Sequence, residues 1–148
     1  MNIKDQIQVL IDDAPDDVTR KAVEMTAPLL QEIAGQLPQE QYYVLQSLGQ
    51  GWVMTTLRGR QNPQVTKTVV YAYPSLAAAS VGQTYNPQMM ALPHASTHLL
   101  FQLISLKQID SLIFLREKGK GQGIEIQRQV IEQALALQLK QPPPTEIA

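Results

Sequence analysis

The chain has 148 residues, of which 44% are hydrophobic and 17% are charged, and its formal net charge is −1. This size and apolar content predict a single compact domain with its own hydrophobic core. The near-neutral charge argues against a protein that binds DNA or RNA through their phosphates. The absence of cysteine excludes disulfides, thiolate metal ligands and cysteine nucleophiles. No apolar run approaches the roughly 18 residues that a membrane-spanning helix needs, so we expect a soluble, cytoplasmic protein.

Two helices are predicted before any strand. Apolar residues at helical spacing between Ile3 and Ile11 predict an amphipathic helix over residues 3–12. A second helix is predicted to begin at Asp16 and Asp17, to end near Gly35, and to pack through the stripe Val18, Ala22, Met25, Leu29 and Ile33. Because Pro28 lies inside this stripe and lacks an N–H, we expect a kink or break near Glu24 and Met25.

Three strands are predicted to follow. Residues 42–48 and 52–57 favour β-structure and flank the turn Gly49-Gln-Gly51, which predicts a hairpin. A third strand is predicted over residues 65–73, after a polar loop. Consecutive strands usually pair with each other, so the simplest arrangement is an antiparallel meander.

The third strand stops abruptly at a proline and becomes an alanine-rich helix. Pro74 cannot donate to a sheet, and the hydroxyl of Ser75 can accept a hydrogen bond from the first turn of the next helix as its N-cap. After a loop over residues 82–87, residues 88–92 predict a short strand that Pro93 closes. Pro93 also suits the first turn of a helix predicted over residues 94–106.

The last third of the chain holds one strand and one helix. Ser111–Leu115 is a continuous apolar run, which predicts a strand covered on both faces at the centre of the sheet. The final helix is predicted to begin near Glu125. The proline-rich residues 141–148 are predicted to form an extended, disordered tail.

These elements together predict an α+β fold. We expect a mixed, mostly antiparallel sheet of about five strands with helices mainly on one face and an N-terminal helical pair. Residues 1–140 are predicted to form one domain, in which residues 1–38 are helical and residues 41–139 supply the sheet and the other helices. The single tryptophan, Trp52, and the neighbouring tyrosines are interpreted as packing residues of this sheet.

The order of elements resembles the N-terminal domain of the enhanced serine sensitivity (SseB-like) family. Four stretches carry the resemblance: residues 69–79, 89–93, 99–103 and 112–119. The chain departs from the family pattern at Pro74, where the family has threonine, and at Arg116-Glu117, where it has Asn-Pro. The resemblance would span residues 16–139, and it implies a regulatory or binding module without agreed catalytic residues.

His94 and His98 are the only histidines, and they lie four positions apart on a predicted helix. That spacing lets two imidazoles share a transition metal, which makes a metal-dependent enzyme one alternative function. Such a site needs further ligands, and the nearest acidic residue that follows is Asp110. We therefore favour local hydrogen bonding for both histidines and expect no cofactor.

A second alternative is a small-ligand or anion-binding domain at the N-terminus of the helix that follows Ser75. Backbone N–H groups at a helix start attract anions, and Lys118 and Lys120 could add positive charge. The glycine-rich segment around these lysines lacks the order of a phosphate-binding loop, and Ser75 lacks the glycines of a nucleophile elbow. Ser75 is thus expected to cap the helix rather than to catalyse.

The function predicted from the sequence is a non-enzymatic protein-interaction or regulatory module. Neither a nucleophile with a base nor a complete set of metal ligands is recognisable in the chain. The expected partner is another protein or a second copy of the chain, which would bind an exposed sheet edge or the stripe around Ile3. Neither nucleic acid nor a membrane is expected as a partner.

Overall fold

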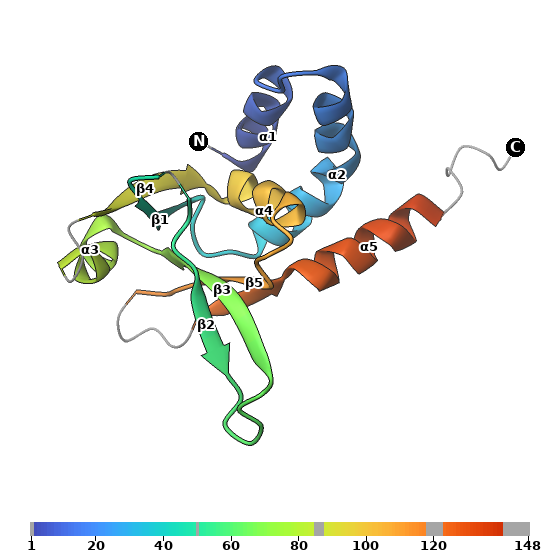
Figure 1. Ribbon diagram of the computed structural model, residues 1–148. Helices are drawn as coiled ribbons and strands as arrows, with labels where there is room; N and C mark the ends of the chain where they lie inside the picture. The colour runs from blue at the N-terminus through green and yellow to red at the C-terminus, as the bar shows by residue number, and fades with distance from the viewer. Residues whose placement is uncertain (1, 50, 85–87, 118–122, 141–148) are drawn as a thin grey trace, which may run out of the picture.

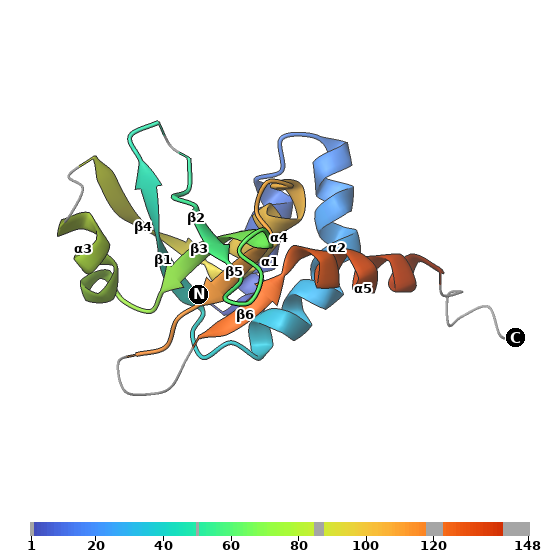
Figure 2. The same cartoon turned by 60° about the horizontal axis from the view of Figure 1, so that its bottom comes forward.

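The architecture is a mixed β-sheet with helices packed against it (Figures 1 and 2). The computed structural model describes residues 2–49, 51–84, 88–117 and 123–140. Within these ranges there are five helices and six strands, so the predicted α+β class is confirmed. The lysines 118 and 120 and the expected tail over residues 141–148 lie outside the described residues.

The central strand of the sheet is β3 (Thr66–Tyr73). One edge of β3 pairs in tandem with β1 (Gln41–Ser47) and β2 (Thr55–Arg58), both antiparallel, and its other edge pairs in parallel with β5 (Ser111–Phe114). The outer strands are β4 (Met89–Ala95), antiparallel to β1, and β6 (Ile124–Gln127), antiparallel to β5. The sheet order is therefore β4-β1-β3-β5-β6 with β2 also on β3, and β5 is an inner strand but not the central one.

The helices α1 (Ile3–Asp12), α2 (Asp17–Gly35) and α4 (Ser96–Ser105) pack together on one face of the sheet. The last helix, α5 (Arg128–Lys140), continues directly from β6, and Figure 1 shows its far end projecting away from the body. The short helix α3 (Leu76–Thr84) lies at the β1–β4 end of the sheet, apart from the other helices (Figure 2). It extends into the predicted loop over residues 82–87 as far as Thr84.

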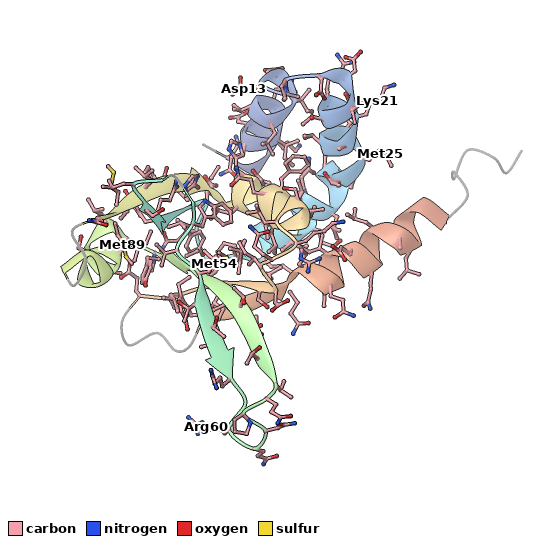
Figure 3. All side chains as sticks on the ribbon, in the orientation of Figure 1. Asp13, Lys21, Met25, Met54, Arg60 and Met89 are labelled. Carbon is pink, nitrogen blue, oxygen red and sulfur yellow. The ribbon has the colours of Figure 1, made fainter. Side chains whose placement is uncertain are left out.

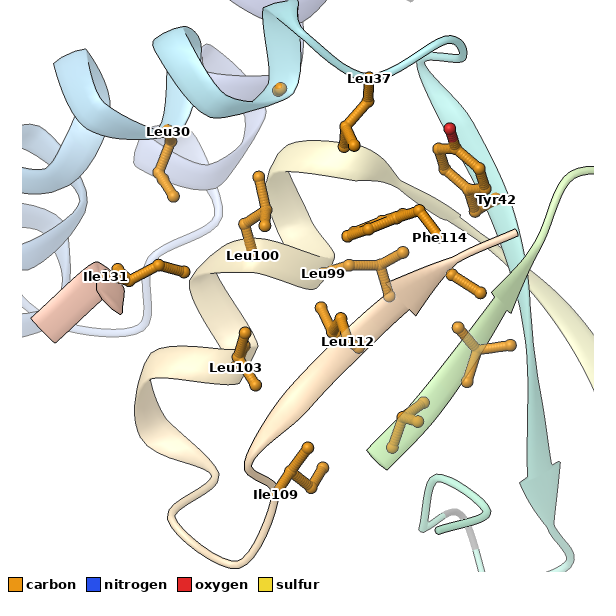
Figure 4. Close-up of a cluster of buried hydrophobic side chains, with 14 of the residues drawn as sticks. Leu30, Leu37, Tyr42, Leu99, Leu100, Leu103, Ile109, Leu112, Phe114 and Ile131 are labelled. Atoms are coloured by element: carbon orange, nitrogen blue, oxygen red, sulfur yellow. The ribbon is translucent and has the colours of Figure 1, made fainter. Parts of the chain in front are cut away.

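The hydrophobic core lies between α4 and the sheet. Alternate residues of the strands face α4, among them Tyr42 and Phe114, whose rings meet edge to face with their centroids 4.9 Å apart. In Figure 4 the side chains of α4 lie between Leu30 and Ile131 on one side and the strand residues on the other. Because α4 is enclosed on both sides, its core leucines are fully buried: Leu99, Leu100 and Leu103.

The predicted N-terminal helical pair is present, and side chains cap both helices. The Asn2 side chain accepts a 2.8 Å hydrogen bond from the Asp5 amide, and the Asp16 carboxylate accepts one of 2.7 Å from the Thr19 amide. The same bond lowers the pKa of Asp16 because it stabilises the charged form. Helix α2 continues through Pro28, so the helix is not broken there. Figure 2 shows that it changes direction along its length, as a kinked helix does.

The buried face of α2 is centred one position later than the predicted stripe, although Leu29 and Ile33 of that stripe do pack against the core. The buried residues are Val23, Thr26, Leu30 and Ala34, while Val18 is 79% and Met25 49% exposed. Adjacent helix positions differ by about 100° in direction, so Val18 and Met25, each beside a position of the buried face, point away from it. Threonine and alanine contribute to the true face, and an apolar pattern alone does not favour them.

Two predicted strand boundaries also differ from the structure. The first predicted hairpin reduces to an isolated bridge between Gln46 and Trp52, and the strand after it begins at Thr55 and pairs with β3 instead of β1. The final helix begins at Arg128, because residues 124–127 pair with β5 as strand β6. Ile124 and Ile126 alternate with polar residues, and this short alternation is compatible with either type of element.

Candidate functional site

Ser75 caps α3, as its position after the strand predicts. Its hydroxyl accepts a 3.1 Å hydrogen bond from the Ala78 amide. Since Lys118 and Lys120 lie outside the described residues, Ser75 is the only member of the predicted anion site that the structure places.

The two histidines do not share a helix, so that part of the prediction is wrong. His94 lies in strand β4 opposite Tyr42, and His98 lies in the first turn of α4. The helix starts later than predicted because β4 pairs with β1 over seven residues and continues through Pro93 to Ala95. Pro93 is tolerated there because β4 is an edge strand, where a missing N–H can face solvent.

The His94 side chain is half-buried beside a glutamine and the tryptophan. Its Nε2 atom lies 2.7 Å from the Oε1 atom of Gln46, and its ring meets that of Trp52 at a centroid distance of 6.1 Å. Burial lowers the pKa of His94 below its usual value, and the nearby His98 adds to this shift. The imidazole is therefore held in its neutral form over a wider pH range than an exposed histidine.

His98 is bound to a buried glutamine that the sequence analysis did not single out. Its Nε2 atom lies 3.0 Å from the backbone oxygen of Gln6. The Gln6 side-chain oxygen accepts hydrogen bonds from the amide and the hydroxyl of Thr97, at 3.1 and 2.7 Å, and its nitrogen donates to the Glu40 carbonyl at 2.8 Å. Gln6 thus connects α1, the start of α4 and the residue before β1. Its position inside the apolar stripe of α1 is the one sequence signal that could have indicated this role.

The metal-site hypothesis finds no further ligand in the described part of the chain. No group of three histidine, aspartate or glutamate side chains is close enough there to hold a metal ion. Both histidines instead have hydrogen-bond partners of their own, as the local interpretation expects.

None of the helices described has the length and apolar character needed to cross a bilayer.

Two helices carry apolar residues beside their buried faces. On α2 these are Val18, Ala22 and Met25, here named the α2 outer stripe, and Figure 3 shows Met25 on the side of α2 away from α1. On α5 the exposed members are Val130 and Leu137, at 55% and 64%. Single exposed apolar residues are common on monomeric proteins, whereas on α2 two of them lie on the same side of one helix.

No protein-family model, curated protein or solved structure matches the chain.

Proposed function

We propose that this protein is a non-enzymatic interaction module that associates with a second copy of itself through the α2 outer stripe. The observation that carries the proposal is the exposure of Val18 and Met25 on a helix whose other apolar face is already buried in the core. The residues lie at the i, i+4, i+7 spacing by which one helix packs against another. Self-association would remove this apolar row from water.

Charges beside the stripe support a second copy as the partner. Lys21 and Glu32 are exposed, lie on the same side of the stripe and are about three helical turns apart. Neither belongs to an ion pair in the described part of the chain. If two α2 helices cross antiparallel between Thr26 and Ala27, Lys21 of each copy lies opposite Glu32 of the other, and Met25 lies opposite Pro28. A two-fold axis produces this complementarity twice from one surface.

The contact surfaces expected from the sequence are less suited to this role. Ile7 is buried, and Ile3, Leu10 and Ile11 pack against the core, so the Ile3 stripe is used within the molecule. The free edge of β4 contains Pro93, which cannot donate a hydrogen bond to an added strand. The α2 outer stripe has neither obstacle.

Sedimentation velocity over a range of protein concentrations tests the proposal. Met25→Lys should shift the protein towards monomer, because it places a cation in the apolar contact. Val65→Lys is the matched control, since Val65 is similarly exposed at 59% but lies between β2 and β3. A wild-type protein that remains monomeric at every concentration would contradict the proposal.

A charge exchange tests the antiparallel geometry separately. Lys21→Glu and Glu32→Lys should each weaken the dimer, because each sets like charges against each other. The double variant should regain most of the lost association. If the double variant loses as much free energy of dimerisation as the two single variants together, the antiparallel pairing is wrong even where a dimer exists.

A further inference from the structure

A cavity opens beside His94 on the helical face of the sheet. It has a volume of about 340 Å³ and lies between β1, the segment that leads into β2, and the C-terminal end of α4. Its walls include Gln46, Trp52, Met54, His94, Gln102 and Leu106, and Figure 3 marks Met54 where the chain enters β2. The volume is within the range of small-molecule sites in proteins, roughly 300–1,000 Å³.

We name this space the His94 cavity. Its lining combines apolar surface with uncharged polar groups. Trp52, Met54 and Leu106 supply apolar area, and Gln46, Gln102 and Ser105 supply amides and a hydroxyl. Among the described lining residues His94 alone is titratable, and its burial favours the neutral form. A charged ligand would therefore find no opposite charge in the lining to offset the hydration that it gives up there.

We infer that the His94 cavity binds a small, uncharged, planar molecule whose edge carries both hydrogen-bond donors and acceptors, such as a carboxamide on an aromatic ring. The Gln102 amide can donate and accept, and the Ser105 hydroxyl oxygen, whose hydrogen is donated to the Gln102 carbonyl, can still accept, so the two residues match an amide edge. The indole of Trp52 offers an aromatic wall for the ring. The site is separate from the α2 outer stripe, and the inference does not depend on self-association.

Nicotinamide and nicotinate are suitable probes because they share a ring and a shape and differ in charge. Trp52 is the only tryptophan, so its indole N–H gives one assignable NMR signal at the wall of the cavity. Nicotinamide at up to about 10 mM should shift this signal with saturation, and nicotinate should bind at least about tenfold more weakly. An unshifted signal with nicotinamide, or equal affinity for the two probes, would overturn the inference.

A pair of glycine variants tests whether the cavity itself is the site. Gly51 lines the cavity, and a Cβ added there meets no atom within 4 Å, so Gly51→Leu should obstruct the space without disturbing the fold. Gly35 has the same free space at the end of α2, outside the cavity, which makes Gly35→Leu the matched control. Nicotinamide binding should be lost in the first variant and retained in the second. Equal binding by both variants would place the ligand elsewhere and would also overturn the inference.

Discussion

The Thr97 hydroxyl donates a 2.7 Å hydrogen bond to the side-chain oxygen of Gln6, although the two residues are 91 positions apart in the sequence. Both residues are buried, and the same oxygen also accepts from the Thr97 amide. A polar side chain in a core is stable only when its groups are paired. The Gln6 contacts therefore fix how α1 docks on the start of α4.

We predict that Gln6→Leu lowers the free energy of unfolding by about 2–4 kcal/mol, because it leaves the buried amide and hydroxyl of Thr97 without their acceptor and removes one of the donors to the Glu40 carbonyl. Gln8→Leu is the control, since Gln8 lies on the exposed side of α1 and bonds only to Asp12 in the described structure. Urea denaturation followed by circular dichroism measures both. Equal stability of the two variants would mean that the Gln6 network contributes little.

The core at the end of β5 should be sensitive to truncation. Phe114 is fully buried and its ring contacts that of Tyr42, so Phe114→Ala is expected to cost about 3–5 kcal/mol. Phe101 on α4 is only half-buried, and Phe101→Ala should cost clearly less. Thermal and urea unfolding give the two values, and a larger loss at Phe101 would show that the buried side of α4 is assigned incorrectly.

Stability should fall at mildly acidic pH because of His94. The folded pKa of this residue is below its usual 6.5, so the unfolded chain binds the proton more tightly. The stability that neutral His94 allows is complete above pH 6.5, and the free energy of unfolding decreases as the pH falls below that value. In His94→Gln this part of the pH dependence should disappear, as measured by the free energy of unfolding at successive pH values. A pH profile unchanged by the substitution would assign the effect to other groups.

The Glu125 carboxylate joins β6 to its neighbour β5 and to β3 beyond it. It accepts hydrogen bonds from Lys67 at 2.8 Å and from Ser111 at 2.6 Å, and these donors lower its pKa. Lys67→Met should raise the pKa of Glu125, as followed by NMR titration of the carboxyl group. Lys107→Met should leave it unchanged, since Lys107 does not contact Glu125. A Glu125 pKa that stays low without Lys67 would identify Ser111 as the main cause.

The features that could be predicted from the sequence depend on neighbouring residues. Asp16 and Ser75 both cap helices through an amide three positions ahead, so their surroundings in the chain are sufficient to indicate the role. The switch from strand to helix at Pro74 is local in the same way, and it was predicted correctly.

The features that could not be predicted depend on contacts between distant segments. His94 is in a strand because residues 41–47 pair with β4, and no residue near His94 encodes that pairing. The polar contacts of Gln6 and the wall that Trp52 forms beside His94 require the folded sheet. The candidate sites were therefore less predictable than the helices that surround them.

β1 and β2 lie in tandem on the same edge of β3, and the segment between Ser47 and Thr55 leaves that edge before the chain returns to it. This excursion supplies Gly51, Trp52 and Met54 to the His94 cavity. Backbone hydrogen bonds join Ser47 to Gly51 and Val53 to Leu45, and Trp52 packs against the core, so this segment belongs to the scaffold as well as to the cavity wall. An engineered change of ligand preference should therefore substitute an exposed side chain of this segment, such as Met54, and keep its backbone hydrogen bonds to β1.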